Sequence, residues 1–300
     1  MEKYFYHTLK ILKSLSVRPV RTFNWIREDL KKDLDSKNYK SPYKLVWCAG
    51  LPKSGSTLVE KIFDHLPYVR LNSSFNRIYF DKNLDHDHGI SELIFSNIPK
   101  EKYTFLKTHT HYEDKYEKIA LSHNSRIIIS LRDIRDMLIS RYYHILSFKN
   151  HWLHQDLKNL NFTEGFILSF TARENKSSPS VLKYYYDWIN DWIKIGKQKN
   201  YLVLWYEQYN LDPIKYIKDI LQYVDFSNYS ADKIYNKIIF ENNKKTSLTK
   251  SLARYGRDKT TFRKGEVGEW QKLFNEEITE SFNKNLPGEL KNILFQYDQL

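Results

Sequence analysis

The chain has 300 residues, and its 41% of hydrophobic residues is enough to bury one large α/β core or two small ones. No stretch of 18 apolar residues occurs, so no membrane-spanning helix is predicted, and lysines interrupt the first residues too often for a secretory signal. The net charge of +12 indicates an anionic partner, but no zinc finger, RRM or homeodomain pattern supports nucleic acid.

Cysteine usage indicates the compartment. Cys48 is the only cysteine, so intrachain disulfides are impossible and a reducing, cytoplasmic location is expected. Cys48 also lies within a predicted strand, where we expect a small buried hydrophobe rather than a nucleophile.

Residues 1–43 are predicted to form a basic amphipathic N-terminal segment. Phe5, Leu9 and Leu12 share one helical face, and lysines occupy the others. We favour a helix packed on the domain, and the alternative is a peripheral contact with an anionic membrane. Residues 44–300 contain no internal repeat and no linker, so they are expected to form one α/β domain.

A phosphate-binding loop is predicted where the first strand ends. The apolar run 45–49 breaks at Gly50, a tight loop reaches Gly55, and Ser56 then opens a segment with helical spacing. Unpaired amides and the helix dipole favour an anion at such a helix start, and Lys53 adds a positive charge.

This loop differs from the nucleotide P-loop G-x-x-x-x-G-K-[ST]. Ser56 stands where that motif has its lysine, and Lys53 lies on the other side of Gly55. The displaced lysine indicates a different phosphate ligand, bound without a metal. The alternative is a glycine turn with an exposed lysine.

The remaining elements alternate between strands and helices. Asp133 is well placed to cap the helix that follows the apolar run 126–131. We expect strands at 68–71, 103–106, 126–131 and 201–205, helices at 133–146, 162–173, 181–195, 213–224 and 230–243, and a final pair of helices after a basic stretch at 244–264. This order predicts a central parallel sheet flanked by helices, with a P-loop-like phosphate-binding loop.

Two clusters are interpreted as structural. The aromatic side chains of the helix at 181–195, from Tyr184 to Trp192, are expected in the core. Asp85-His86-Asp87-His88 lies in the irregular stretch 72–98, where a solvated turn is expected rather than a metal site.

Chemically active side chains follow four of the predicted strands. Ligands of parallel sheets bind beyond the carboxyl ends of the strands. Those ends present Lys53, Ser54, Ser56 and Thr57; Lys107 and His109; Arg132; and Tyr206. Such a set suits a nucleotide with more than one phosphate and a proton acceptor beside it.

Arg132 and Ser140 indicate a second phosphate site. They are eight residues apart, so both reach one phosphate only if it lies beside the helix, away from the Lys53 loop. Arg263-Lys264-Gly265 can complete this site with a bidentate guanidinium and a glycine that permits close approach.

Together these motifs resemble the cytosolic-type sulfotransferase family. The matches run in family order and are Pro52-Lys53-Ser54-Gly55-Ser56-Thr57-Leu58, similar to P-K-S-G-T-T-W; Lys107-Thr108-His109, similar to K-T-H; residues 132–140, similar to R-N-P-K-D-V-x-V-S; Trp205-Tyr206-Glu207, similar to F-Y-E-D; and residues 263–270, similar to R-K-G-x-x-G-D-W. They extend from residue 45 to about residue 270.

The resemblance implies a reaction and its residues. The family moves a sulfuryl group from 3′-phosphoadenosine 5′-phosphosulfate (PAPS) to an acceptor and leaves adenosine 3′,5′-bisphosphate (PAP). It implies His109 as general base and Lys53 and Lys107 as charge stabilisers, with no metal. The residues by themselves leave His111 and His123 as rival bases. The implied cofactor-binding residues are Lys53, Ser54, Gly55, Ser56, Thr57, Leu58, Arg132, Ser140, Tyr206, Phe240, Arg263, Lys264 and Gly265.

Departures from the family pattern concern the adenine, the acceptor and the dimer. Leu58 replaces a tryptophan that stacks on adenine, and Phe240 matches an adenine-contacting phenylalanine. The family's dimerisation pattern near Lys272 is poorly kept, so the oligomeric state stays open. The acceptor is expected to be a hydroxyl or amine of a small molecule or lipid, and the many aromatic residues favour an apolar one.

Two other functions are compatible with parts of the sequence. A P-loop small-molecule kinase explains 50–57 but not the missing lysine. A non-catalytic basic module at a membrane surface explains residues 1–43 and the charge, but neither His109 nor the second phosphate site.

Overall fold

The computed structural model describes residues 43, 45–66, 69–71, 103–252, 265–286, 288, 293 and 294, with side chains described only up to residue 241 within the helix that ends at 252. Most of the predicted N-terminal segment and all of Asp85–His88 lie outside the described residues, so the division at residue 44 stays a prediction.

The core of the fold is a five-stranded parallel sheet with the strand order β2-β3-β1-β4-β5. Every residue of the central strand β1 is buried. Its neighbours on either side are β3 and β4, which pair with it in parallel along its length. The strands are β1 (Leu45–Gly50), β2 (Val69–Leu71), β3 (Tyr103–Thr108), β4 (Ser125–Leu131) and β5 (Leu202–Trp205).

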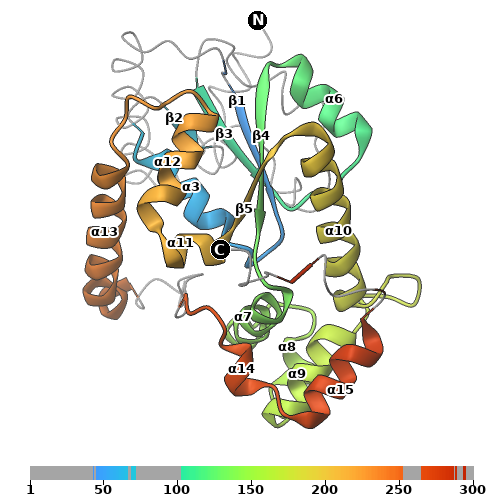
Figure 1. Cartoon of the computed structure of the whole chain (residues 1–300). Coiled ribbons are helices and arrows are strands. Elements are labelled where there is room, and N and C mark those ends of the chain that lie inside the picture. Colours follow the sequence, from blue (N-terminus) through green and yellow to red (C-terminus); the bar gives the residue numbers. More distant parts are fainter. Residues whose placement is uncertain are drawn as a thin grey trace, which may run out of the picture.

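Helices cover both faces of this sheet (Figure 1). One layer holds α3 (Ser56–Asp64), α11 (Tyr206–Leu211), α12 (Pro213–Tyr223) and α13 (Ala231–Leu252). The other face is covered by α6 (Asp114–Ser122) and α10 (Val181–Lys199). Beyond the carboxyl edge lie α7 (Ile134–Ser147), α8 (His154–Leu157), α9 (Phe162–Thr171), α14 (Trp270–Leu273) and α15 (Glu276–Asn285).

Alternation along β1 produces two hydrophobic cores. Side chains of a strand point alternately to the two faces, so Trp47 and Ala49 enter the core beside α10. Val46 and Cys48 enter the core beside α3 and α12. Cys48 is fully buried, and this burial raises the pKa of its thiol to about 12, which confirms that it packs as a hydrophobe.

The predicted sheet, single domain and main helices are confirmed. Asp133 caps α7 as expected, because its side chain accepts a hydrogen bond from the Arg135 amide. The aromatic side chains of α10 are core residues as predicted, with Trp188 and Trp192 fully buried.

Among the described residues, three helices were not predicted and two boundaries differ. The helices α6, α8 and α11 are short, and α6 buries only Glu117 and Ala120, so it has almost no apolar stripe. Strand β3 continues through Thr108, and α13 extends to Leu252. In the described ranges, no helix has the length and apolar character needed to cross a membrane.

Candidate active site

Four neighbouring strands bring the predicted site residues to one edge of the sheet. Because β3, β1, β4 and β5 are adjacent and parallel, their carboxyl ends lie side by side. The Lys53 loop follows β1, His109 follows β3, Arg132 follows β4 and Tyr206 follows β5. The predicted convergence at this edge is therefore confirmed for the described residues.

The loop after β1 has the backbone of an anion-binding turn. Its Ser54 amide donates to the Leu51 carbonyl at 3.1 Å. Lys53 and Gly55 have positive φ angles of 76° and 96°, and Gly55 is the N-cap of α3. Since glycine has no side chain with which to cap the helix, the first amides of α3 have no N-cap side chain to bind.

Glycine is required where the loop begins. A Cβ atom on Gly50 would lie 2.8 Å from Ser54 Oγ and 3.0 Å from the Cβ of Ser130. Ser54 and Ser130 are themselves in contact, because the Ser130 hydroxyl donates to the Ser54 carbonyl at 3.2 Å. These contacts fix the loop against the end of β4.

Lys107 points toward the start of α3. Its Nζ donates to Thr57 Oγ1 at 3.4 Å and forms a salt bridge with Glu60. The ammonium group is therefore close to the predicted phosphate-binding loop, residues 51–55, which we call the phosphate loop, as expected. However, its charge is balanced by the Glu60 carboxylate, which was not predicted to be part of the site.

His109 is held by both its side chain and its backbone. Its Nδ1 donates to the Gly50 carbonyl, which places the proton on Nδ1 and the lone pair of the neutral ring on Nε2. Trp188 Nε1 donates to the His109 carbonyl at 3.2 Å and to the Thr110 carbonyl at 2.9 Å. Trp192 Nε1 donates to the Thr110 carbonyl at 3.1 Å.

The two rival histidines lie in different surroundings. His123 is the C-cap of α6 and precedes β4, so it lies at the opposite, amino edge of the sheet. His111 follows His109 on the same loop, and its ring lies edge-on to Tyr184 with centroids 4.5 Å apart. Burial lowers the pKa of His111, although Asp191 and Asp187 oppose this shift.

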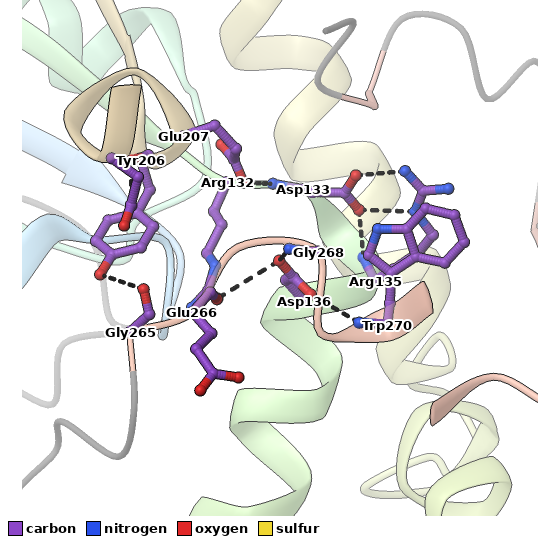
Figure 2. A network of polar contacts seen from close by, with 11 residues as sticks. Arg132, Asp133, Arg135, Asp136, Tyr206, Glu207, Gly265, Glu266, Gly268 and Trp270 are labelled. Carbon is purple, nitrogen blue, oxygen red and sulfur yellow. Dashed lines mark hydrogen bonds and ion pairs between the residues drawn. The ribbon is translucent and has the colours of Figure 1, made fainter. Parts of the chain in front are cut away.

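Arg132 and Tyr206 both contact the C-terminal segment, residues 265–270 (Figure 2). Arg132 is buried, and its Nη2 donates to the Glu266 carbonyl at 2.6 Å. The Tyr206 hydroxyl donates to the Gly265 carbonyl at 3.1 Å, and the Arg132 guanidinium lies 4.8 Å from the centre of the Tyr206 ring. A Cβ atom on Gly55 would lie 2.8 Å from the same ring.

One donor of Arg132 fits an anionic ligand. Its Nε is buried and has no hydrogen-bond partner among the described residues. A buried guanidinium donor left without a partner is costly, and a phosphate oxygen would satisfy it. This observation supports a second phosphate site beside α7.

Asp136 anchors the C-terminal segment to α7 (Figure 2). Its carboxylate accepts from the Gly268 amide at 2.7 Å and from the Trp270 amide at 3.1 Å, and it lies 3.6 Å from Arg132 Nη2. Burial raises the pKa of Asp136 even though Arg132 and the two amides favour the charged form. Arg135 extends the contact, with its guanidinium 3.4 Å from the centre of the Trp270 ring.

Glu207 is hydrogen-bonded to the start of α7. It is fully buried, and its carboxyl group accepts from the Asp133 amide at 3.0 Å. Desolvation by burial raises the pKa of Glu207 to about 7, although the hydrogen bond from the Asp133 amide opposes the shift; the negative charge of Asp133 adds to it.

The other predicted residues are placed less directly. Ser140 is half-buried on α7, one turn beyond Asp136. Leu58 lies on α3 and Phe240 on α13, two helices in contact, and Phe240 is 58% exposed. Gly265 has a φ of 73°, whereas Arg263 and Lys264 lie outside the described residues.

Several supporting residues were not predicted from the sequence. They are Glu60, Asp136, Trp188, Trp192 and Glu207, which hold predicted site residues or the segments that carry them. Asp136 and Glu207 are part of the matched motifs, and this was the only signal that could have identified them. The two tryptophans look like ordinary core residues because only their indole N–H reaches the site.

The fold and the site define an α/β protein whose chemically active side chains meet at the carboxyl edge of a parallel sheet, beside a loop with the backbone of an anion-binding turn. A protein-family model described as the sulfotransferase domain matches residues 44–292. The chain belongs to this family, and membership confirms the resemblance and the predicted class of PAPS-dependent sulfotransferases. Membership also excludes a kinase and a non-catalytic membrane module as the function of the whole chain.

Curated relatives match most of the chain at low identity. Sulfotransferase 1E1 of Rattus norvegicus is 24% identical over 260 residues, which cover 80% of this chain and 81% of the relative. Flavonol 3-sulfotransferase of Flaveria bidentis is 24% identical over 271 residues, covering 84% and 83%.

Solved structures share the fold. Mouse sulfotransferase SULT7A1, complexed with PAP, aligns with a TM-score of 0.55 and 18% identity over 86% of this chain and 88% of that chain. Retinol dehydratase, in complex with androsterone and PAP, aligns with a TM-score of 0.56 and 18% identity over 90% and 88%.

Proposed function

We propose that this sulfotransferase moves a sulfuryl group from PAPS to a hydroxyl or amine of a small-molecule or lipid acceptor, with His109 as the general base. The acceptor oxygen or nitrogen forms a bond to sulfur while the bond from sulfur to the bridging phosphate oxygen breaks. The acceptor proton passes to His109, and PAP leaves with the electron pair of the broken bond.

The hydrogen bond from His109 to Gly50 is the observation that carries this proposal. It fixes the tautomer in which Nε2 is the basic nitrogen, and the Gly50 carbonyl belongs to the start of the phosphate loop. The proposed base is therefore positioned by the same loop that is proposed to hold the donor. Trp188 holds the backbone of the same histidine.

We assign the donor's 5′-phosphosulfate to the loop after β1. Lys53 stabilises charge on the bridging oxygen, and Ser54, Ser56, Thr57 and the loop amides hold the phosphate. Lys107 assists at the sulfonate only when its ammonium is released from Glu60, because the structure shows the two in a salt bridge.

The 3′-phosphate is assigned to the second site. Arg132 supplies its unpartnered Nε, and Ser140, Arg263, Lys264 and Gly265 complete the site in this proposal. Leu58 and Phe240 are proposed to lie against the adenine, since α3 and α13 are in contact. The matched motifs support these assignments.

The surroundings of the reaction are also proposed. A cytoplasmic location is supported by the lone buried cysteine. Peripheral membrane contact through residues 1–43 stays a prediction, because those residues lie almost entirely outside the described part of the chain.

Replacement of His109 tests the assignment of the base. We expect His109→Ala to lower turnover by about 10²–10⁴-fold, because proton removal from the acceptor is lost. Calorimetric affinity for PAP should change little, since the His109 side chain bonds the Gly50 carbonyl, which is not one of the groups proposed to hold the phosphates. The measurement compares the two quantities in the full-length chain.

Two matched variants serve as controls. His123→Ala changes a histidine at the opposite edge of the sheet and should keep full turnover, and His111→Ala should keep most of it. An active His109→Ala enzyme would exclude His109 as the base, and an inactive His111→Ala enzyme would transfer the role to His111.

A further inference from the structure

A group of basic side chains lies beyond the carboxyl edge of the sheet, on α7, α8 and the loop between them. We call Arg141, His144, His151 and His154 the basic cluster. Arg141 and His144 are three residues apart on α7, so they share a helix face. His154 Nδ1 bonds the Ile145 carbonyl at 2.9 Å, which fixes α8 against the end of α7.

Electrostatic and ring interactions link this cluster to the neighbourhoods of the proposed donor lysine and the proposed base. The charge of Lys53 lowers the pKa of His144, so the phosphate loop lies within electrostatic range of this histidine. On the other side, Tyr184 contacts His111 with ring centroids 4.5 Å apart, close to His109 along the chain. The neighbouring Tyr185 acts electrostatically on Arg141.

The charges that act on the pKa values of His144 and His151 are all positive. Burial lowers the pKa of His144, and Lys53 and Arg141 lower it further. Burial, Arg141, His144 and His154 lower the pKa of His151 to about 4. No carboxylate of the described part of the chain contributes to either shift.

Arg141 is the permanent charge of the cluster. Burial lowers the pKa of its guanidinium, but arginine stays protonated in proteins. Its Nη1 donates to the Ser169 carbonyl at 2.8 Å, and within the described residues it forms no salt bridge. A half-buried guanidinium balanced only by a backbone carbonyl favours the arrival of an anion.

Exposed aromatic rings border the same cluster. Phe148 is 47% exposed and stacks on His144 with centroids 5.8 Å apart. Trp152 is 43% exposed and stacks on His151 at 5.7 Å. The cluster therefore offers a cationic centre with an apolar rim.

We infer that the acceptor carries an acidic group in addition to the hydroxyl or amine that receives the sulfuryl group. Arg141 binds the acidic group, the rings of His144 and His151 donate hydrogen bonds to it, and Phe148 and Trp152 contact the apolar body. This inference rests on the proposed function, because it assigns the cluster, which lies within electrostatic range of the proposed donor lysine Lys53, to the acceptor site. It adds an anionic group to the apolar acceptor expected from the sequence.

Matched ligand pairs test this inference on the PAP-saturated full-length protein. Calorimetry compares 12-hydroxydodecanoate with 1,12-dodecanediol, and 4-hydroxybenzoate with 4-hydroxybenzamide. In at least one pair the acid should bind about tenfold to a hundredfold more tightly, because charge-assisted hydrogen bonds replace neutral ones. Absence of acid preference in both pairs, including absence of binding, overturns the inference.

Variants then assign the preference to Arg141. Arg141→Gln should remove the advantage of the acid and leave PAP affinity unchanged, and Arg141→Met should do the same while keeping the packing of the stem. Lys149→Gln, an exposed position just after α7, removes the same charge and should keep the advantage. Persistence of the acid preference in either stably folded Arg141 variant overturns the inference.

The two proposals fail in different ways. Failure of the wild-type protein to bind PAP contradicts the proposed function itself. Normal PAP binding without acid preference contradicts only the acidic acceptor.

Discussion

Lys53 combines an unfavourable backbone conformation with a proposed catalytic role. Its φ of 76° lies in the left-handed region, which costs a residue with a side chain about 1–2 kcal/mol. Glycine would avoid most of this cost. Strained residues of this kind cluster at ligand clamps and active sites, which agrees with the place of Lys53 in the phosphate loop.

Two substitutions separate the strain from the function of Lys53. Lys53→Ala and Lys53→Gly should both lower turnover by roughly 10²–10³-fold, because both remove the charge at the bridging oxygen. Lys53→Gly should nevertheless be more stable than Lys53→Ala by about 1 kcal/mol. Chemical denaturation and turnover at saturating PAPS give the two quantities.

Each result for Lys53 can be contradicted separately. Equal stability of the two variants would mean that the loop in solution is not left-handed at this position. Turnover close to wild type in both variants would remove Lys53 from the catalytic residues.

At the scale of elements, Asp136 joins α7 to the segment before α14. Asp136 accepts hydrogen bonds from the amides of Gly268 and Trp270, which both belong to that segment. Arg132 donates to the Glu266 carbonyl of the same segment. The second phosphate site therefore depends on a contact between two parts of the chain that are more than a hundred residues apart.

Asp136→Asn weakens this contact with little change in shape. An amide has one oxygen instead of two, so at least one buried backbone donor loses its acceptor. We expect the free energy of unfolding to fall by about 1–3 kcal/mol and the Kd for PAP to rise severalfold. Denaturation and calorimetry measure the two effects.

Asp187→Asn is the matched control for this change. Asp187 forms an exposed salt bridge with Lys183 on α10, so its loss should cost less than about 1 kcal/mol and leave PAP affinity unchanged. If the two variants bound PAP equally well, the anchor would have no role in the second phosphate site.

The elements show why part of the site could be predicted from sequence. Strand β4 is a continuous apolar run that ends at Arg132, and the loop after β1 carries glycines at fixed spacing. Both strand ends could therefore be predicted from the sequence. The hydrogen bond from Trp188 to His109 joins residues 79 positions apart and leaves no local pattern. The salt bridge from Lys107 to Glu60 depends on the register of β3 against β1 in the same way.

At the scale of the whole molecule, one buried carboxyl group makes stability depend on pH. Glu207 joins the start of α11 to the start of α7, where its carboxyl group accepts from the Asp133 amide. Burial raises its pKa from 4.5 to about 7, so the folded protein holds a proton in this range that the unfolded chain has lost. By linkage, the free energy of unfolding falls as pH rises from about 4.5 to about 7 and levels off above that range.

Glu207→Gln removes this dependence and keeps an oxygen that can accept from the Asp133 amide. The variant should gain stability relative to wild type as pH rises from 5 to 8, by up to about 3 kcal/mol. Glu280→Gln, an exposed position on α15, should follow the wild-type pH profile. Denaturant unfolding at each pH measures the difference, and parallel profiles for Glu207→Gln and wild type would mean that Glu207 is ionised in the folded protein without a stability cost.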